Sequence, residues 1–148
     1  MKNFELSAIT NCFTRLPTIF FYTNSILSCN DSIYRVDSTY NYKFDDACNS
    51  LYTTLKENPT VVIELQGHAS AKEKNPDELA LYRAQLIKEI LVAKGINRKR
   101  IETKGWGNHK RLVKDDVIKK VKTNEEKNAL HTKNQRVVFR ILNWDFEN

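Results

Sequence analysis

The side chains best suited to catalysis or metal binding in this sequence are three histidines, His68, His109 and His131. No H-E-x-x-H segment, paired metal spacing or nucleophile elbow accompanies them. The three cysteines are Cys12, Cys29 and Cys48. Their odd number and the lack of a C-x-x-C spacing indicate buried thiols rather than a zinc site or a disulfide framework. We therefore expect no enzyme activity, no metal and no cofactor.

Arg83 has a position that suggests a different chemistry, the binding of an anion. It lies in a segment with strong helix signals, where Asn75 stands as the N-cap and Pro76 takes the first helical position. An acidic residue three positions after the cap completes a capping box. The apolar stripe of this helix passes through Ala80 and Ala84, so the guanidinium group should emerge at the edge of the core. There it can either lie across apolar surface or clamp a carboxylate with two hydrogen bonds.

Hydrophobic periodicity predicts the elements that must position Arg83. Strands are indicated at residues 18–22, 61–66, 100–103 and 136–142. Helices are indicated at residues 44–58 and 75–94, with room for another after Thr123. The order β-α-β-α-β-(α)-β favours an α+β sandwich in which the helices cover one face of a small sheet.

Length and composition indicate one folded domain. The chain has 148 residues, of which 41% are hydrophobic, and a formal charge of +6. A chain of this length hides roughly 70% of its unfolded surface, which is enough for a core without disulfides or metals. We place the domain at residues 16–143, with an arm at 1–15, an irregular excursion at 25–43, a basic insert at 108–132 and a tail at 144–148. No apolar run approaches the ~20 residues of a transmembrane helix.

Positive charge is concentrated between Lys94 and Lys122, where eleven basic residues accompany three acidic ones. Such a block is either a solvated segment or a surface for nucleic acid, anionic lipid or an acidic protein. Aromatic residues do not interleave with this run as a base-stacking platform requires, so we expect no nucleic-acid binding. An envelope protein as partner of residues 94–122 stays open.

The N-terminal segment gives no convincing signal peptide, because Glu5 interrupts its start and no long apolar core follows Lys2. The run Ile26-Leu27-Ser28-Cys29 nevertheless resembles the lipobox of bacterial lipoproteins, which would make Cys29 a lipidation site. Cleavage before Cys29 would discard the strand expected at 18–22. A buried thiol is therefore the favoured interpretation.

Four motifs in order resemble the signatures of the OmpA-like peptidoglycan-binding domain. They are Gly67-His68-Ala69-Ser70, Leu79-Ala80-Leu81-Tyr82-Arg83-Ala84, Lys94-Gly95-Ile96 with Arg100-Ile101 and Gly105-Trp106-Gly107, and Asn134-Gln135-Arg136-Val137. Each motif is weak alone, but their order and spacing over residues 16–143 are specific. The phrases at 58–65 and 131–134 are similar to versions in Bacteroidetes-type envelope proteins. The resemblance implies a two-layer sandwich with a small mixed four-stranded sheet.

The resemblance also implies a non-catalytic role at the periplasmic face of the outer membrane or elsewhere in the cell envelope. Domains of this kind hold the diaminopimelate residue of peptidoglycan stem peptides and so tether an envelope protein to the wall. The zwitterionic end of that ligand needs an arginine for its carboxylate and an acid for its ammonium group. The arginine maps to Arg83 and the acid to Ser70, while Asn134 and Arg136 match the supporting motif.

The sequence departs from the family pattern where the ammonium group would bind. Ser70 supplies no charge, so a contribution of ~1.5–3 kcal/mol falls toward ~1 kcal/mol and the affinity falls about tenfold or more. Ala69 replaces a threonine, and Gln135 stands where an arginine is usual. We expect Glu73, the only acid between Ser70 and the helix cap, to share the ammonium side with Ser70. The alternative is a scaffold that has lost its ligand and serves as a protein-interaction domain in an outer-membrane, secretion or motility complex.

Overall fold

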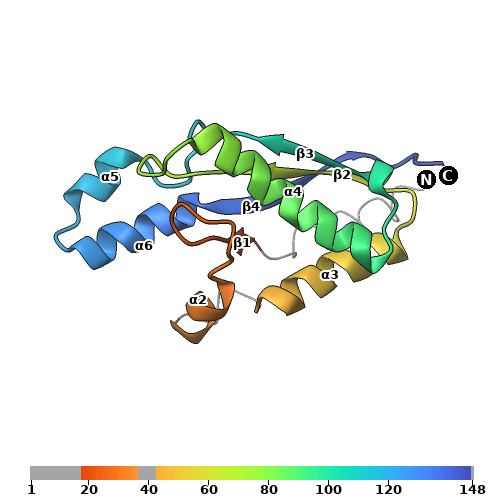
Figure 1. Ribbon diagram of the computed structural model, residues 1–148, viewed down its shortest axis with the longest axis horizontal. Coiled ribbons are helices and arrows are strands. Elements are labelled where there is room, and N and C mark those ends of the chain that lie inside the picture. The colour runs from red at the N-terminus through yellow and green to blue at the C-terminus, as the bar shows by residue number, and fades with distance from the viewer. Residues whose placement is uncertain (1–17, 37–42, 148) are drawn as a thin grey trace.

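The computed structural model describes residues 18–36 and 43–147. Within these residues the chain forms four strands and six helical segments, and Figure 1 shows their arrangement. They are β1 (Ile19–Phe20), α2 (Asn30–Val36), α3 (Phe44–Glu57), β2 (Val62–Gly67), α4 (Pro76–Lys94), the 3-10 turn η1 (Arg98–Arg100), β3 (Ile101–Gly105), α5 (Asp115–Lys120), α6 (Asn124–Asn134) and β4 (Arg136–Asn143). The arm expected at 1–15, with Cys12, lies outside the described residues.

The four strands form one mixed sheet in the order β1-β4-β2-β3. Strands β2 and β3 are parallel, whereas β4 runs antiparallel to both β2 and β1. A helix crosses from β2 to β3, as parallel neighbours require. The mixed four-stranded α+β sandwich expected from the sequence is therefore confirmed.

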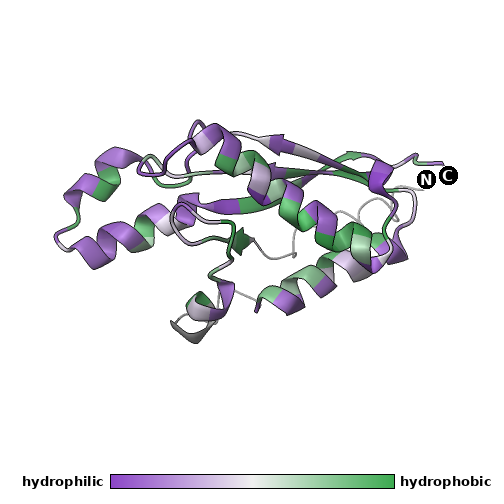
Figure 2. Ribbon diagram, in the orientation of Figure 1, coloured by the Kyte–Doolittle hydropathy of each residue, from purple (hydrophilic) through white to green (hydrophobic). Residues whose placement is uncertain are grey.

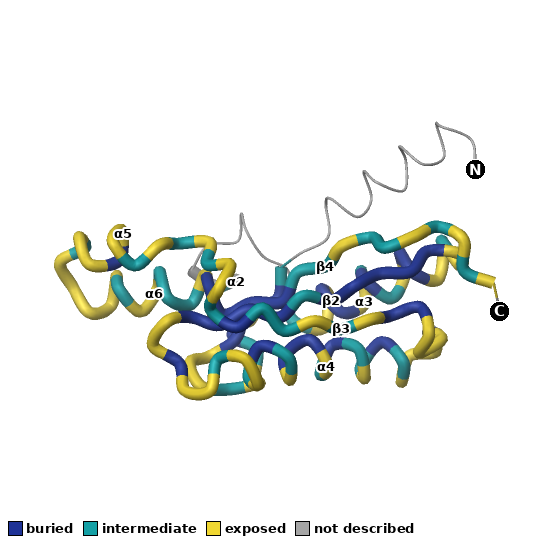
Figure 3. Tube along the Cα trace, turned by 90° about the horizontal axis from the view of Figure 1, so that it is seen from above, coloured by how far each residue is buried: buried dark blue, intermediate teal, exposed yellow. Residues whose placement is uncertain are grey.

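Helices α3 and α4 contribute the helical layer of the core. The buried stripe of α4 runs through Ala80, Ala84, Ile87 and Leu91, as the periodicity predicted. The stripe of α3 includes Cys48, Leu51 and Leu55. These side chains pack with buried residues of the strands in one apolar cluster. Figure 2 shows hydrophobic residues alternating with hydrophilic ones along both helices, and Figure 3 shows the buried residues gathered between the layers.

Two glycines allow the first turns of α4 to lie directly on the ends of β2 and β3. A Cβ added at Gly67 would stand 1.7 Å from the carbonyl oxygen of Ala80. At Gly105 it would stand 2.8 Å from the backbone nitrogen of Leu81. Because these glycines are paired across the strands, the carboxyl ends of both strands meet the start of α4, where Arg83 lies.

Several expectations require correction. The excursion at 25–43 is not irregular throughout, because α2 occupies residues 30–36. The expected first strand is reduced to two residues, with a single bridge from Phe21 to Ser28 beyond it. The basic insert contains α5 and nearly all of α6, which project from one end of the sheet (Figure 1). The tail is held to the body, since Phe146 donates its backbone N–H to Thr60.

The start of α4 also differs from the expected capping box. Asn75 adopts a left-handed conformation with φ of 48° and its side chain caps no backbone group. Its carbonyl oxygen instead accepts the first helical hydrogen bond, from Leu79. The side-chain oxygen of Asn24 accepts a hydrogen bond from the backbone of Lys74, so the loop before α4 is tied to the loop after β1. The left-handed stop at Gly95 is as expected.

Candidate ligand-binding site

Arg83 is fully buried, with 0% of its surface exposed, although it stands on the face of α4 next to Ala84. Its Nε donates to the carbonyl oxygen of Ser25 at 3.0 Å. One terminal nitrogen donates to the His68 carbonyl and to Glu73, and the other to the Tyr22 carbonyl and to Glu73. A guanidinium group has five N–H donors, so every donor of Arg83 has a partner.

Glu73 is the carboxylate that Arg83 clamps. The two side chains form a bidentate pair in which neither is exposed. The backbone N–H of Ser70 donates to one Glu73 oxygen at 2.9 Å, and the backbone N–H of Asn24 donates to the other at 2.8 Å. We call this arrangement of Arg83, Glu73 and the 22–25 loop the Arg83 clamp. Four hydrogen bonds satisfy the carboxylate, because two come from the guanidinium group and two from backbone amides.

The Ser70 side chain is also buried and engaged. Its hydroxyl is in hydrogen-bond contact with the side-chain oxygen of Gln135 at 2.9 Å, and Ser70 has 0% exposure. Gln135 donates its side-chain N–H to the carbonyl oxygen of Phe21 at 2.9 Å. The family resemblance marked Gln135 only as a departure from the pattern, whereas in the structure it joins Ser70 to Phe21, the residue after β1.

Asn134 and Arg136 face the basic insert rather than the Arg83 clamp. The side chain of Asn134 makes a two-way contact with the backbone of Val113, accepting at 2.8 Å and donating at 2.9 Å. Arg136 donates to the carbonyl oxygens of Asn134 and Lys110. Burial lowers the pKa of Arg136 to about 10. These two residues therefore fix the insert, and their hydrogen bonds give them no direct part in holding Glu73.

Two residues of the Gly67-His68-Ala69-Ser70 segment, His68 and Ala69, are buried beneath the surface next to Ser70. Ala69 is buried and donates its backbone N–H to the carbonyl oxygen of Gly107 at 2.7 Å. His68 is 3% exposed, and neither ring nitrogen has a hydrogen-bond partner among the described residues. The pKa of His68 is lowered to about 3, mainly by burial and to a smaller extent by the positive charges of Arg136 and Lys110. His68 is consequently a neutral imidazole at physiological pH.

The sequence did not single out the loop after β1, yet it supplies much of the clamp. Tyr22 and Ser25 offer carbonyl oxygens, Asn24 offers a backbone N–H, and the ring of Phe21 lies 5.3 Å from the Arg83 guanidinium carbon. A cavity beside this loop is lined by Asn24, Lys74, Asn75, Glu78, Leu79 and Tyr82. The side chain of Tyr22 is half exposed. Backbone groups leave no signal in a sequence, which is why this contribution was missed.

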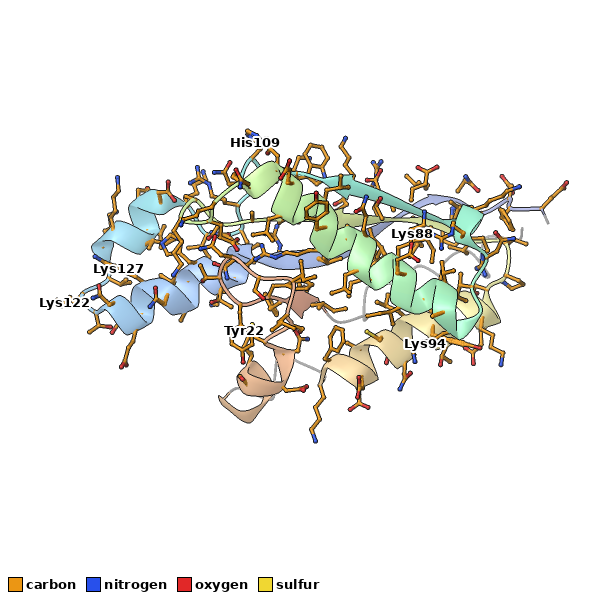
Figure 4. The ribbon with its side chains drawn as sticks, viewed as in Figure 1. Tyr22, Lys88, Lys94, His109, Lys122 and Lys127 are labelled. Atoms are coloured by element: carbon orange, nitrogen blue, oxygen red, sulfur yellow. The ribbon has the colours of Figure 1, made fainter. Side chains whose placement is uncertain are left out.

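The cysteines and the basic residues that the sequence offered as candidates do not come together in a site in the described part of the chain. Cys29 and Cys48 are buried free thiols, and burial raises the pKa of each to about 11. Among the described residues no cluster of histidine, cysteine or acidic side chains could hold a metal ion. Lys94 and Lys122 lie toward opposite ends of the molecule (Figure 4). The basic residues of 94–122 therefore do not form one surface, because η1 and β3 carry the chain along the sheet between them.

Comparison with known proteins places this architecture in a family. The model of the OmpA family matches residues 32–128. This chain belongs to the OmpA family. Comparison with curated protein sequences gives no significant match. No helix in the described part of the chain has both the length and the apolar character needed to cross a membrane.

Solved structures share the OmpA-like fold at low sequence identity. The peptidoglycan-associated lipoprotein from Burkholderia pseudomallei is 16% identical, with a TM-score of 0.62 over 85% of this chain and 90% of that one. The C-terminal domain of Helicobacter pylori MotB is 18% identical, with a TM-score of 0.60 over 84% and 82%. The OmpA-like domain of FopA1 from Francisella tularensis subsp. tularensis SCHU S4 is 18% identical, with a TM-score of 0.52 over 85% and 74%.

Proposed function

We propose that this chain is a non-catalytic module of a bacterial cell envelope that binds peptidoglycan stem peptides weakly through the Arg83 clamp. Membership of the OmpA family and likeness to a peptidoglycan-associated lipoprotein support the wall as partner. The structural observation that carries the proposal is that Arg83 already holds a carboxylate by two hydrogen bonds in a buried position. The chemistry of the Arg83 clamp is therefore carboxylate recognition.

Binding of an external carboxylate requires exchange with Glu73. All five donors of Arg83 are in use, so the carboxylate of a diaminopimelate residue can reach the guanidinium group only when Glu73 leaves it. Ser70 stands where the resemblance puts the acid for the ammonium group, and it offers a hydroxyl only. Both features lower the affinity, since a buried competitor must be displaced and the ammonium group meets no charge.

The complete pairing of the clamp also supports a second function. The Glu73 carboxylate accepts hydrogen bonds from the backbone of Asn24 and Ser70 as well as from Arg83. These bonds can serve only to hold the 22–25 loop in place. In that case the domain is an OmpA-like scaffold whose surfaces bind envelope proteins and whose clamp stays closed. Copurifying proteins that survive lysozyme digestion of the wall would support this alternative.

Titration of a diaminopimelate-containing muropeptide onto the full chain separates the two functions. The informative variant is Glu73→Gln, which keeps the shape of the side chain and removes the charge that competes for Arg83. If the clamp binds the wall, we expect millimolar binding to the unmodified chain and about tenfold tighter binding to Glu73→Gln. The matched control is Glu89→Gln, which changes an exposed glutamate on α4 and should bind like the unmodified chain.

The opposite results are equally clear. If neither the unmodified chain nor Glu73→Gln binds at millimolar muropeptide while both give native amide spectra, the clamp is a closed scaffold feature. If Glu73→Gln binds more weakly than the unmodified chain, Glu73 contacts the ligand itself, as we expected from the sequence, and the exchange mechanism is wrong.

A further inference from the structure

A second group of polar side chains lies at the carboxyl ends of β2 and β3, on the face of the sheet opposite α4. Gly67 and Gly105 are paired and both are directed at α4, because an added Cβ at either would meet its backbone. Successive residues of an extended chain point to opposite faces. Lys104, Trp106 and His68 therefore project from the other face, away from Arg83.

Two lysines place their ammonium groups over the ring of Trp106. The Lys104 ammonium nitrogen lies 4.0 Å from the ring centroid, and that of Lys110 lies 3.8 Å from it. Both lysines are exposed, whereas Trp106 is half-buried. Neither lysine forms an ion pair with an acid in the described part of the chain. Two like charges held at one ring repel each other, and an anion bound beside them at the ring edge would relieve that repulsion.

The same cluster contains buried hydrogen-bonding atoms without partners. They are the indole Nε1 of Trp106 and both ring nitrogens of His68. Buried polar atoms are nearly always paired in folded proteins, so such exceptions indicate a missing partner. Arg136 donates a hydrogen bond to the carbonyl oxygen of Lys110 at 3.1 Å, which fixes the loop that carries this lysine. The charges of Arg136 and Lys110 both help to lower the pKa of His68, so the region is electropositive.

Asp77, the acidic residue near this cluster, contacts the opposite side of the loop that carries Lys110. Asp77, at the start of α4, lies against Gly107 and 3.6 Å from the Nε2 of His109, on the helix side of the loop. His109 marks this edge in Figure 4. Asp77 therefore pairs with His109 and leaves Lys104 and Lys110 without an acidic partner.

We propose that Lys104, Lys110 and Trp106 form a binding site for a phosphate group, separate from the Arg83 clamp. A lysine ammonium group is a compact charge that can bind a phosphate from any direction. A planar carboxylate instead binds best to the two parallel N–H groups of an arginine. The buried and unpaired indole N–H of Trp106 lies next to the two lysines, so its resonance should respond to a phosphate bound there. The phosphate can belong to a soluble phosphoester or to a lipid headgroup, since the recognising chemistry is shared.

Titration of inorganic phosphate onto the full chain tests the site, with the indole N–H resonance of Trp106 as the readout and that of Trp144 as internal reference. We expect a saturable shift of the Trp106 resonance at millimolar phosphate. The double variant Lys104→Ala with Lys110→Ala should lower the affinity about tenfold or more. The control is Lys119→Ala with Lys120→Ala, which removes the same charge from exposed residues of α5 and should keep the affinity.

Vesicles distinguish the source of the phosphate. Sedimentation with phosphatidylglycerol but not phosphatidylcholine vesicles, lost in the Lys104 and Lys110 variant and kept in the control, assigns a lipid headgroup. Binding of inorganic phosphate without vesicle binding assigns a soluble phosphoester. Equal phosphate affinities for the two double variants, or no shift of the Trp106 resonance, would overturn the proposal.

Discussion

At the scale of single residues, Arg83 and His68 are the ionisable side chains whose surroundings differ most from those expected for their residue types. The sequence placed Arg83 at the edge of the core, but the structure encloses it completely and supplies a carboxylate from within the same chain. Removing one partner of such a buried pair costs about 3–5 kcal/mol, because the other charge is left unpaired. The clamp therefore contributes to the fold whether or not it exchanges its carboxylate.

His68 predicts a specific dependence of stability on pH. Its folded pKa of about 3 lies below the ordinary value of 6.5, so between these values the unfolded chain takes up a proton that the folded chain does not. Stability should fall as the pH drops below 6.5, and His68 should have no effect above that pH. We expect the free energy of unfolding in urea to fall by about 1 kcal/mol from pH 7.5 to pH 5.5 through this residue.

The variant His68→Gln isolates that contribution. It should flatten the pH dependence over the same interval relative to the unmodified chain. His109→Gln, which changes an exposed histidine, should leave it in place. A slope unchanged by His68→Gln would show that the imidazole is protonated or solvated in the folded state.

At the scale of elements, the close contact between α4 and the strand ends positions the clamp. The contact depends on the missing side chain at Gly67, since its Cβ would overlap the backbone of Ala80. Backbone cannot move aside as a flexible side chain can, so the helix would have to shift as a whole. Any such shift would also move Arg83, which lies less than one turn further along α4.

Gly67→Ala is therefore expected to be strongly destabilising. We expect a loss of about 3 kcal/mol or more in the free energy of unfolding, because the overlap is with backbone. Gly95→Ala is the matched control: its φ of 119° disfavours alanine, but nothing lies within 4 Å of the added Cβ. That change should cost about 1 kcal/mol. Urea unfolding of both variants checks the order, and equal losses would contradict the close-packing argument.

At the scale of the whole molecule, residues 18–28, which precede Cys29, are held to the fold by several contacts. Strand β1 pairs with β4, and the loop after it gives Arg83 two carbonyl acceptors. Cys29 itself is buried and donates its backbone N–H to Phe20. A free N-terminus at Cys29, as the lipobox-like sequence would require, is incompatible with these contacts.

We expect a chain that begins at Cys29 to fail to fold. It would lack β1 and would leave the guanidinium group of Arg83 with two unpaired donors, so its amide spectrum should collapse and its near-ultraviolet circular dichroism should vanish. Cys29→Ala in the full chain is the control and should remain folded, because the thiol packs as a small apolar group. A native spectrum from the shortened chain would show that processing at Cys29 is compatible with the fold.

The sequence by itself determined the order of strands and helices, the apolar stripes of α3 and α4, and the choice of Arg83 as the anion-binding candidate. These features follow from local periodicity, glycine positions and motif order, all of which a sequence displays directly. It could not give the length of β1 or the presence of α2, because neither has a strong pattern of its own.

Only the tertiary structure decided what Arg83 binds. Its partners come from Tyr22, Ser25, His68 and Glu73, which are distant in sequence and contribute mainly through backbone groups. Backbone carbonyls and amides are the same in every residue, so their convergence is invisible until the chain is folded. The same holds for Lys104 and Lys110, which β3 and its following turn bring to one ring. Residue types show which chemistry is available, and packing selects which groups meet.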